Sequence, residues 1–385
     1  MEKLVYQGSP DEQARILFSL KNAARSIAER VGLSENEAVV LTGGFGRGEG
    51  ALSKEPDGAI RPFNDFDILL VGARPAMPRS LLLELKSGLP ASLGVDFVDL
   101  GYVRASDLQK AEPTVFLYDL KRGSQVLWGS QCALDAVPPF APSELPLTEG
   151  TRFFLNRGVG LLSLLLMIER GEAAGALRRS AANAWSKTVL AIGDSFLLER
   201  KLYHWSYATR LKRMDETGAF PKGDGFASKY RDAAVFKVTA DFGKLPSEDP
   251  LELFAEARSL HERYFRLFEE RRTFSSIADW REYPAAVVRA GLIPFKRRVK
   301  ESLSTLARSA LQPRELMRFA RLPLVGEERR LALLPLLLYA VRGRVSQTVD
   351  RRYVETACRL ELGRTGNSAE DWIQLASKFA GGAHP

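Results

Sequence analysis

The stretch that most constrains this chain is an apolar run that ends in two glycines, VVLTGGFGRGEG at residues 39–50. The β-branched and aliphatic residues at its start predict a buried strand. Gly43 and Gly44 follow, and because glycine has no Cβ, the backbone can turn tightly there and approach a ligand closely. Arg47 comes within the next turn. The sequence therefore predicts a strand that ends in a ligand-binding turn.

A second apolar strand, NDFDILLV at residues 64–71, carries two acids. Asp65 and Asp67 alternate with Phe66 and Ile68, and side chains alternate across a strand, so both carboxylates should face one side. Two carboxylates held side by side repel each other, so packing alone does not explain the pair. Carboxylate and phosphate oxygens are the ligands that Mg²⁺ prefers. The pair therefore indicates a divalent-metal site.

A third acid belongs to the segment GVDFVDLGYV at residues 94–103, which reads as a further strand. Asp96 lies near the start of this strand and Asp99 lies nearer its end. The residues alone leave both as candidates for a third carboxylate of the site.

These three features together resemble the DNA polymerase β-type nucleotidyltransferase superfamily: a strand ending in Gly-Gly, an Asp-x-Asp strand and a following strand with one more acid. The phrase VDFVDL is similar to the third-carboxylate strand of the minimal members, in which the first acid is the ligand. The resemblance covers about residues 11–129. It implies that Asp65, Asp67 and Asp96 are the catalytic and metal-binding residues, with Asp99 as the alternative third ligand.

The sequence departs from the family pattern in two places. Gly44 stands where many members have serine, which removes one hydroxyl contact to phosphate. Residues 51–62 separate the glycines from the Asp-x-Asp strand, and residues 53–63 read as an exposed loop.

The resemblance implies an enzyme, a magnesium-dependent nucleotidyltransferase that moves a nucleoside monophosphate from an NTP onto a hydroxyl acceptor and releases pyrophosphate. Two Mg²⁺ ions, or Mn²⁺ in their place, would be its cofactors. ATP is the expected NTP. Gly43 and Gly44 would present backbone N–H groups to the phosphates, Arg47 would add positive charge at the leaving group, and Glu49 reads as a local partner for Arg47. The alternative is a nucleotide-binding or partner-interaction module without catalysis on the same fold.

The length of 385 residues predicts two domains. Residues 138–146 hold four prolines and read as a linker. The predicted fold class is α+β. A nucleotidyltransferase domain over residues 1–137, with a small mixed sheet and flanking helices, precedes an all-α helical C-terminal domain over residues 147–385. Helical periodicity is clear at residues 10–31, whereas residues 114–118 and 125–128 read as two strands of a hairpin.

The helical domain supplies three further candidates. In the superfamily such a domain commonly closes over the nucleotide, and ammonium, hydroxyl and aromatic groups suit contacts to phosphate and base. By that resemblance Lys187, within a predicted helix at 178–200, and Ser206 and Tyr207, within another at 203–214, are nucleotide-binding candidates.

Charge divides unevenly along the chain, whose net charge is +8. Residues 1–150 carry 15 Lys and Arg against 20 Asp and Glu, and residues 151–385 carry 40 against 27. A basic second half is compatible with RNA, an acidic substrate or an anionic membrane, and equally with a solvated surface. The acceptor therefore stays open between RNA or tRNA, a protein and a small molecule.

Location in the cell follows from two weaker signals. Cys132 and Cys358 are far apart and match no metal pattern, which favours a reducing compartment and hence the cytoplasm. We expect no signal peptide and no transmembrane segment, and peripheral membrane contact only as a minor alternative. The oligomeric state does not follow from the sequence.

Overall fold

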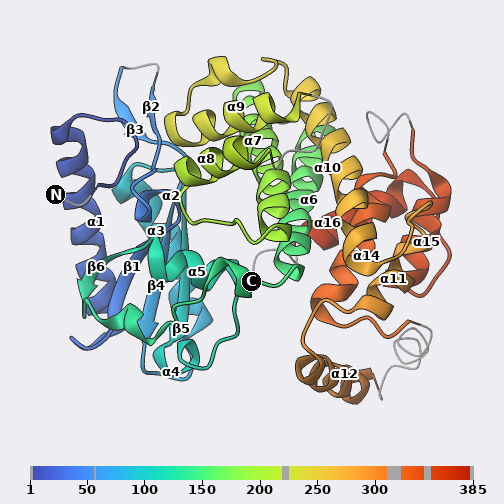
Figure 1. Cartoon of the computed structure of the whole chain (residues 1–385), viewed down its shortest axis with the longest axis horizontal. Helices are drawn as coiled ribbons and strands as arrows, with labels where there is room; N and C mark the ends of the chain where they lie inside the picture. Colours follow the sequence, from blue (N-terminus) through green and yellow to red (C-terminus); the bar gives the residue numbers. More distant parts are fainter. Residues whose placement is uncertain (1–2, 56–57, 219–224, 310–321, 342–347, 382–385) are drawn as a thin grey trace. The chain divides into compact units, whose positions relative to one another are not determined.

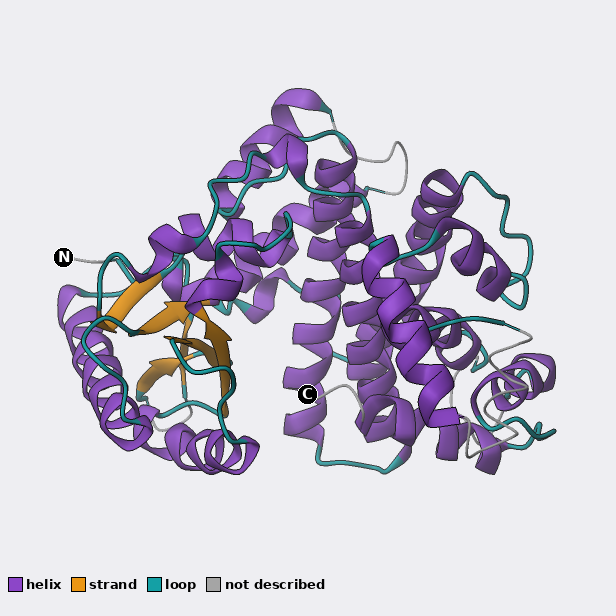
Figure 2. Cartoon of the chain, turned by 90° about the horizontal axis from the view of Figure 1, so that it is seen from below, coloured by secondary structure: helices purple, strands orange, loops and turns teal. Residues whose placement is uncertain are grey.

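One four-stranded sheet organises the N-terminal part of the chain, in the order β5-β4-β1-β6. The structure is a computed structural model that describes residues 3–55, 58–218, 225–309, 322–341 and 348–381. The strands of the sheet, which Figures 1 and 2 show, are β1 (Ala38–Thr42), β4 (Asp65–Gly72), β5 (Phe97–Arg104) and β6 (Gln125–Gly129).

The sheet is mixed, since β1 runs antiparallel to both β4 and β6 while β4 and β5 are parallel. In the register, Thr42 is opposite Asp67, and Asp67 is in turn opposite Asp99 of β5. Together with the many helices, this sheet confirms the predicted α+β class.

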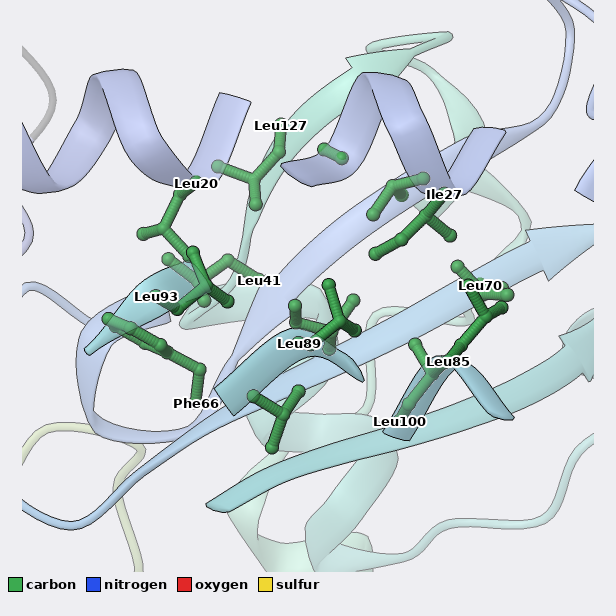
Figure 3. Close-up of a cluster of buried hydrophobic side chains, with 14 of the residues drawn as sticks. Leu20, Ile27, Leu41, Phe66, Leu70, Leu85, Leu89, Leu93, Leu100 and Leu127 are labelled. Carbon is green, nitrogen blue, oxygen red and sulfur yellow. The ribbon is translucent and has the colours of Figure 1, made fainter. Parts of the chain in front are cut away.

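Two helices cover one face of the sheet, namely α1 (Pro10–Val31) and α3 (Arg79–Leu93). Leu20 and Ile27 of α1 and Leu89 of α3 meet Phe66 and Leu70, which alternate along β4 (Figure 3). This cluster also includes Leu41 of β1 and Leu100 of β5, so three neighbouring strands share one buried apolar layer.

The other face is covered over part of its area by α4 (Ala105–Leu108), α5 (Val115–Arg122) and the 3-10 turn η1 (Ala133–Ala136). Leu69 and Val71 of β4 are buried there against Leu117 and Leu120 of α5. The apolar cover on this face thus reaches the C-terminal half of β4.

The first helix begins and ends where its sequence predicts. Ser9 caps it, because its hydroxyl accepts a hydrogen bond from the backbone N–H of Glu12 while the Glu12 carboxylate accepts one from Ser9 N–H. At the other end Gly32 adopts a left-handed conformation with φ of 68°. The predicted helix at residues 10–31 is confirmed.

The predicted hairpin at residues 114–128 is wrong, because its first arm is the helix α5. The Thr114 hydroxyl accepts a hydrogen bond from Leu117 N–H and so caps the helix, and Lys121 and Arg122 lie in its last turn, where positive charge is favourable. The second arm is β6, and it pairs with β1. Local capping outweighs the apolar run that suggested a strand.

The segment between the glycines and β4 was predicted as an exposed loop, and it contains a short antiparallel pair of strands. They are β2 (Leu52–Lys54) and β3 (Ile60–Pro62), with Ser53 opposite Arg61. The glycines themselves form the one-turn helix α2 (Gly43–Gly46).

Two compact units make up the chain, and they are not consecutive in sequence. Unit 1 consists of Met1–Pro146 and Leu197–Lys244, and unit 2 of Leu147–Phe196 and Leu245–Pro385. The first border coincides with the end of the predicted linker, which contains the 3-10 turn η2 (Pro142–Glu144). The prediction, however, divided the chain only once, and it placed residues 197–244 with the helical domain.

The described part of residues 197–244 completes unit 1 and contains, after the end of α7 (Ala174–Glu199), the helices α8 (Tyr207–Thr217) and α9 (Phe226–Thr239) and the 3-10 turn η3 (Phe242–Lys244). Phe63, just before β4, contacts the rings of Phe236 and Phe242 edge-on at centroid distances of 5.8 and 6.1 Å. Aromatic contacts such as these attach the returning segment to the strands.

Unit 2 is helical in its described part. Its helices are α6 (Thr148–Glu169), α7 (Ala174–Glu199, up to Phe196), α10 (Pro250–Thr273), α11 (Tyr283–Ala290), α12 (Phe295–Ser309), α14 (Gly326–Leu338), α15 (Arg351–Glu361) and α16 (Ala369–Gly381). Among the described helices, α6 alone is long and apolar enough to cross a membrane by length and composition. Most of its apolar stretch is buried inside the unit, where it contacts α10, α14 and α16.

A buried histidine gives unit 2 a predictable response to pH. His261 of α10 is fully buried, with Nε2 2.8 Å from the carbonyl oxygen of Phe154 and Nδ1 2.7 Å from the hydroxyl of Tyr339. The neutral ring satisfies both partners when Nε2 donates to the carbonyl and Nδ1 accepts from the hydroxyl. Burial lowers the pKa of His261 to about 4, although the bond to Phe154 opposes the shift.

We predict that lowering the pH from 7 to 5 destabilises unit 2 through His261. The unfolded chain takes up a proton near pH 6.5 that the folded ring does not accept until about pH 4, so the free energy of unfolding should fall by roughly 2 kcal/mol over this range. Urea unfolding at both pH values measures the fall. The variant His261→Gln should be less stable at pH 7 but should show a smaller dependence on pH. An equal dependence in both proteins would contradict the prediction.

Candidate active site

Asp65 and Asp67 begin β4 and lie on the same face of the sheet as Leu69 and Val71, which follow them at alternate positions. Both aspartates are partly exposed, whereas the intervening Phe66 is buried on the opposite face. The face that is apolar and covered along the second half of β4 is thus acidic and accessible along the first half. The alternation predicted for this strand is confirmed.

Phe66 holds this arrangement in place from below. Its ring contacts the ring of Phe45 in α2 at a centroid distance of 4.6 Å, and both side chains are buried. Because Phe66 is fixed between the two aspartates, the strand cannot rotate to exchange its faces without exposing an aromatic ring.

Gly43 lies directly against the carboxylate of Asp67. Its φ is 64°, and a Cβ placed on it would be 1.9 Å from Oδ2 of Asp67. Any other residue would clash with the carboxylate and would also be strained in the left-handed region. At Gly44, by contrast, the nearest atom to such a Cβ would be 3.7 Å away. The first glycine is therefore required by the geometry, while the second has room for a side chain.

Asn64 sets the direction of Asp65 at the entrance of the strand. Its backbone is left-handed, with φ of 77°, a conformation that asparagine tolerates better than most residues. Its side-chain amide donates a hydrogen bond to Oδ1 of Asp65. The other strand contributes Thr42, whose hydroxyl donates to the backbone carbonyl of Asp67 over 3.3 Å.

The register between β4 and β5 determines which acid of β5 lies next to Asp67. Asp99 is opposite Asp67, is largely exposed and forms an ion pair with Lys86, whose Nζ lies 3.0 Å from Oδ1 of Asp99. Asp96 is exposed in the bend that precedes β5. Within the described residues, no three His, Cys, Asp or Glu side chains form a group that could hold one metal ion. Asp65 and Asp67 are therefore described as a pair of carboxylates.

Glu49, just after the glycine turn, connects this turn to the start of α8 by hydrogen bonds. Its buried carboxylate accepts a hydrogen bond from the Ser206 hydroxyl at 2.8 Å and from the Tyr207 backbone N–H at 2.9 Å. Ser206 is also the N-cap of α8. The negative charge of Glu49 thus lies at the N-terminus of the helix, where it is favourable.

Arg47 is enclosed by acids and an aromatic ring. Its guanidinium lies 3.6 Å from Glu49 and 3.5 Å from Asp119 of α5, and it lies over the ring of Tyr207 at 5.4 Å. Glu49 as a partner of Arg47 is confirmed. Burial alone lowers the pKa of Arg47, but electrostatic interaction with the Tyr207 side chain and the Asp119 carboxylate outweighs it and leaves the pKa above its ordinary value.

Asp119, Tyr203 and Arg210 complete this buried network, and the sequence analysis did not assign them. Arg210 donates to the Tyr203 hydroxyl at 2.7 Å, and that hydroxyl donates to Asp119 at 3.1 Å. The guanidinium of Arg210 is 3.7 Å from Asp119. The signal available in the sequence was the recurrence of polar and aromatic residues at three- and four-residue intervals between Tyr203 and Arg210. The helix α8, however, begins at Tyr207 and not at residue 203 as predicted.

The predicted site residues thus fall into four places. Asp65, Asp67 and the Gly43-Gly44 turn converge at the end of the sheet, whereas Asp96 lies in the exposed bend before β5. Arg47, Ser206 and Tyr207 belong to the buried network, which we define as Arg47, Glu49, Asp119, Tyr203, Ser206, Tyr207 and Arg210. Lys187 is partly buried in α7 and belongs to unit 2.

Comparison of the sequence with models of protein families gave no match, and comparison with curated proteins gave none either. A function for this chain is therefore inferred from the residues and geometry of the site.

The network gives a stability prediction. Replacing Glu49 by Gln keeps the size of the side chain but leaves Arg47 with less compensating charge in a buried place, so we expect unfolding to become easier by about 3 kcal/mol. The matched control is Glu216→Gln on α8, whose exposed carboxylate lies 3.7 Å from Lys212. That change should cost less than about 0.5 kcal/mol. Urea unfolding measures both, and equal losses would show that the buried charge of Glu49 has no special role.

Proposed function

We propose that unit 1 is a magnesium-dependent nucleotidyltransferase, with a nucleotidyltransferase-type sheet domain, that transfers a nucleoside monophosphate from an NTP to a hydroxyl acceptor. The observation that carries the proposal is the pair Asp65 and Asp67 on the accessible end of a sheet face, with the backbone of Gly43 against one carboxylate. Packing does not require two acids there, because the neighbouring apolar layer ends before them.

The two carboxylates fit a Mg²⁺ ion that arrives with a nucleotide. Mg²⁺ is usually bound by one or two carboxylates together with waters and substrate phosphates, so a complete protein cage is not needed. When bound, such an ion polarises a phosphoryl oxygen and makes an acceptor hydroxyl easier to deprotonate. Asp65 and Asp67 would hold it. A second ion would need another acid, for which Asp99 and Asp96 remain the candidates.

The residues of the chain would act by positioning. Because Gly43 has no side chain, the Asp67 carboxylate lies directly against the turn. The backbone N–H groups of the turn would contribute to binding a phosphate group. Asn64 orients Asp65 through its amide. A carboxylate oriented in advance costs less to reorganise when charge develops in the transition state.

Arg47, Ser206 and Tyr207 take a different role in this proposal from the one the sequence suggested. The Ser206 hydroxyl and the Tyr207 backbone N–H already bind Glu49, and the Arg47 guanidinium already pairs with Asp119. Contact with phosphate would require these bonds to break. Leaving a buried charge without its partner costs about 3–5 kcal/mol. We therefore assign them to holding the glycine turn against α8. Lys187 belongs to unit 2, so the proposal for unit 1 assigns it no contact to the nucleotide.

The hydroxyl acceptor in this proposal belongs to one of three classes, namely RNA or tRNA, a protein, or a small molecule. The second candidate function is nucleotide binding without catalysis. It is favoured by one observation, namely that the described residues form no group of three metal-binding side chains.

The experiment that separates these functions is incubation of the full chain with each α-³²P-labelled NTP, Mg²⁺, and total cellular RNA, protein and metabolites. We predict transfer of label by the unaltered protein and a loss of at least about 100-fold in Asp67→Asn, because one metal-binding charge is removed. Asp107→Asn on the exposed surface of α4 is the control and should transfer label normally.

Melting temperatures of both variants check that the chain stays folded. Labelled NTP that binds but is never transferred would favour the binding module. Full transfer of label by Asp67→Asn would show that the active site is not at β4.

A further inference from the structure

Unit 2 contains a pocket that the proposed function does not use. It lies among α14, α15 and α16 and has a volume of about 180 Å³. Its apolar part is formed by Leu333 and Leu337 of α14 and by Leu375 and Phe379 of α16, all of them buried in the unit. Each pair is spaced by four residues, so each helix presents one apolar face to the pocket.

The rest of the pocket wall is charged, and it carries more positive than negative groups. Arg329, Arg330 and Lys378 contribute three cations and Glu361 one anion. The Glu361 carboxylate is shared, since Arg329 lies 2.8 Å from Oε2 and Lys378 lies 2.8 Å from Oε1. One carboxylate therefore serves two cations.

Arg330 has no such partner. It forms no ion pair with any residue that the structure describes, and its guanidinium lies over the ring of Phe379, 5.4 Å from the centroid. A guanidinium presents five N–H donors in a planar fork that matches a carboxylate. Arg330 thus brings a donor fork to the border between the charged and the apolar walls.

Arg329 is also incompletely compensated. Its Nε is buried and has no hydrogen-bond partner, and burial lowers the pKa of Arg329 in spite of the nearby Glu361. A further anion in the pocket would stabilise this guanidinium as well.

We propose that this pocket binds a small organic carboxylate whose apolar body is about the size of one aromatic ring. The apolar residues would receive the body, and Arg330 would bind the carboxylate group. The size follows from the volume, because a dry cavity of about 150 Å³ holds one benzene molecule. The single charge follows from Glu361, which would repel a second negative charge on the ligand.

Calorimetric titration of the full chain with 3-phenylpropanoate tests the proposal, and the neutral 3-phenylpropanamide is the matched ligand. We expect saturable binding of the carboxylate, at least about tenfold tighter than that of the amide, as expected for one charge-assisted contact to Arg. Binding should be unchanged in Asp67→Asn, since that residue belongs to unit 1. Equal binding of the two ligands, or no saturation by about 10 mM carboxylate, would overturn the proposal.

Two variants locate the binding. Arg330→Gln should abolish the preference for the carboxylate over the amide, whereas Arg359→Gln, on the exposed surface of α15, should leave it intact. Leu333→Phe should fill the pocket and weaken both ligands, with its melting temperature as the check on folding. A preference that survives Arg330→Gln, or tighter binding of the doubly charged phenylphosphonate than of the carboxylate, would also contradict the proposal.

Discussion

The burial of Phe66 between two partly exposed aspartates is the constraint on which the rest of unit 1 depends. Its ring is held by Phe45 and by the layer beneath α1 and α3, so β4 has only one register that keeps aromatic and aliphatic side chains out of water. That register places Asp65 and Asp67 on the opposite face and brings Asp67 against Gly43. The acidic site is thus a consequence of the hydrophobic core below it, and a change that loosens the core would move the carboxylates.

The second constraint is electrostatic, and it explains why the chain returns to unit 1 after α7. Glu49 and Asp119 lie near the glycine turn, and in an isolated sheet domain they would have only Arg47 to compensate them among the residues of the network. The returning segment supplies Arg210, the Tyr203 hydroxyl and the N-terminus of α8. Buried charges are costly unless they are paired and hydrogen-bonded. Residues 197–217 are therefore part of the folding unit that positions the turn.

The difference between local patterns, such as the alternation along β4, and long-range contacts, such as the buried network, also decides what could be predicted from the sequence. Periodicity is local, so the bounds of α1 were predicted to the residue, and strict alternation placed Asp65 and Asp67 correctly on one face. Contacts between residues far apart in the chain produce weaker patterns in the sequence. Nothing near Asp119 indicates that Tyr203, 84 residues later, will bind it. The helix α5 was missed because its apolar run resembles a strand, and only the Thr114 cap, a single residue, indicates otherwise.

The same return of the chain alters the electrostatic argument drawn from the sequence. A division at residue 150 makes the first part acidic and the second strongly basic. When residues 197–244 are counted with the sheet, unit 1 holds 25 Lys and Arg and 25 Asp and Glu, and unit 2 holds 30 against 22. Unit 1 therefore carries its own positive charge, some of which, including Arg47 and Arg210, is consumed inside the network. An NTP bound at Asp65 and Asp67 would meet a domain with no net charge, so its phosphates must be attracted by local groups and a metal ion rather than by the overall field.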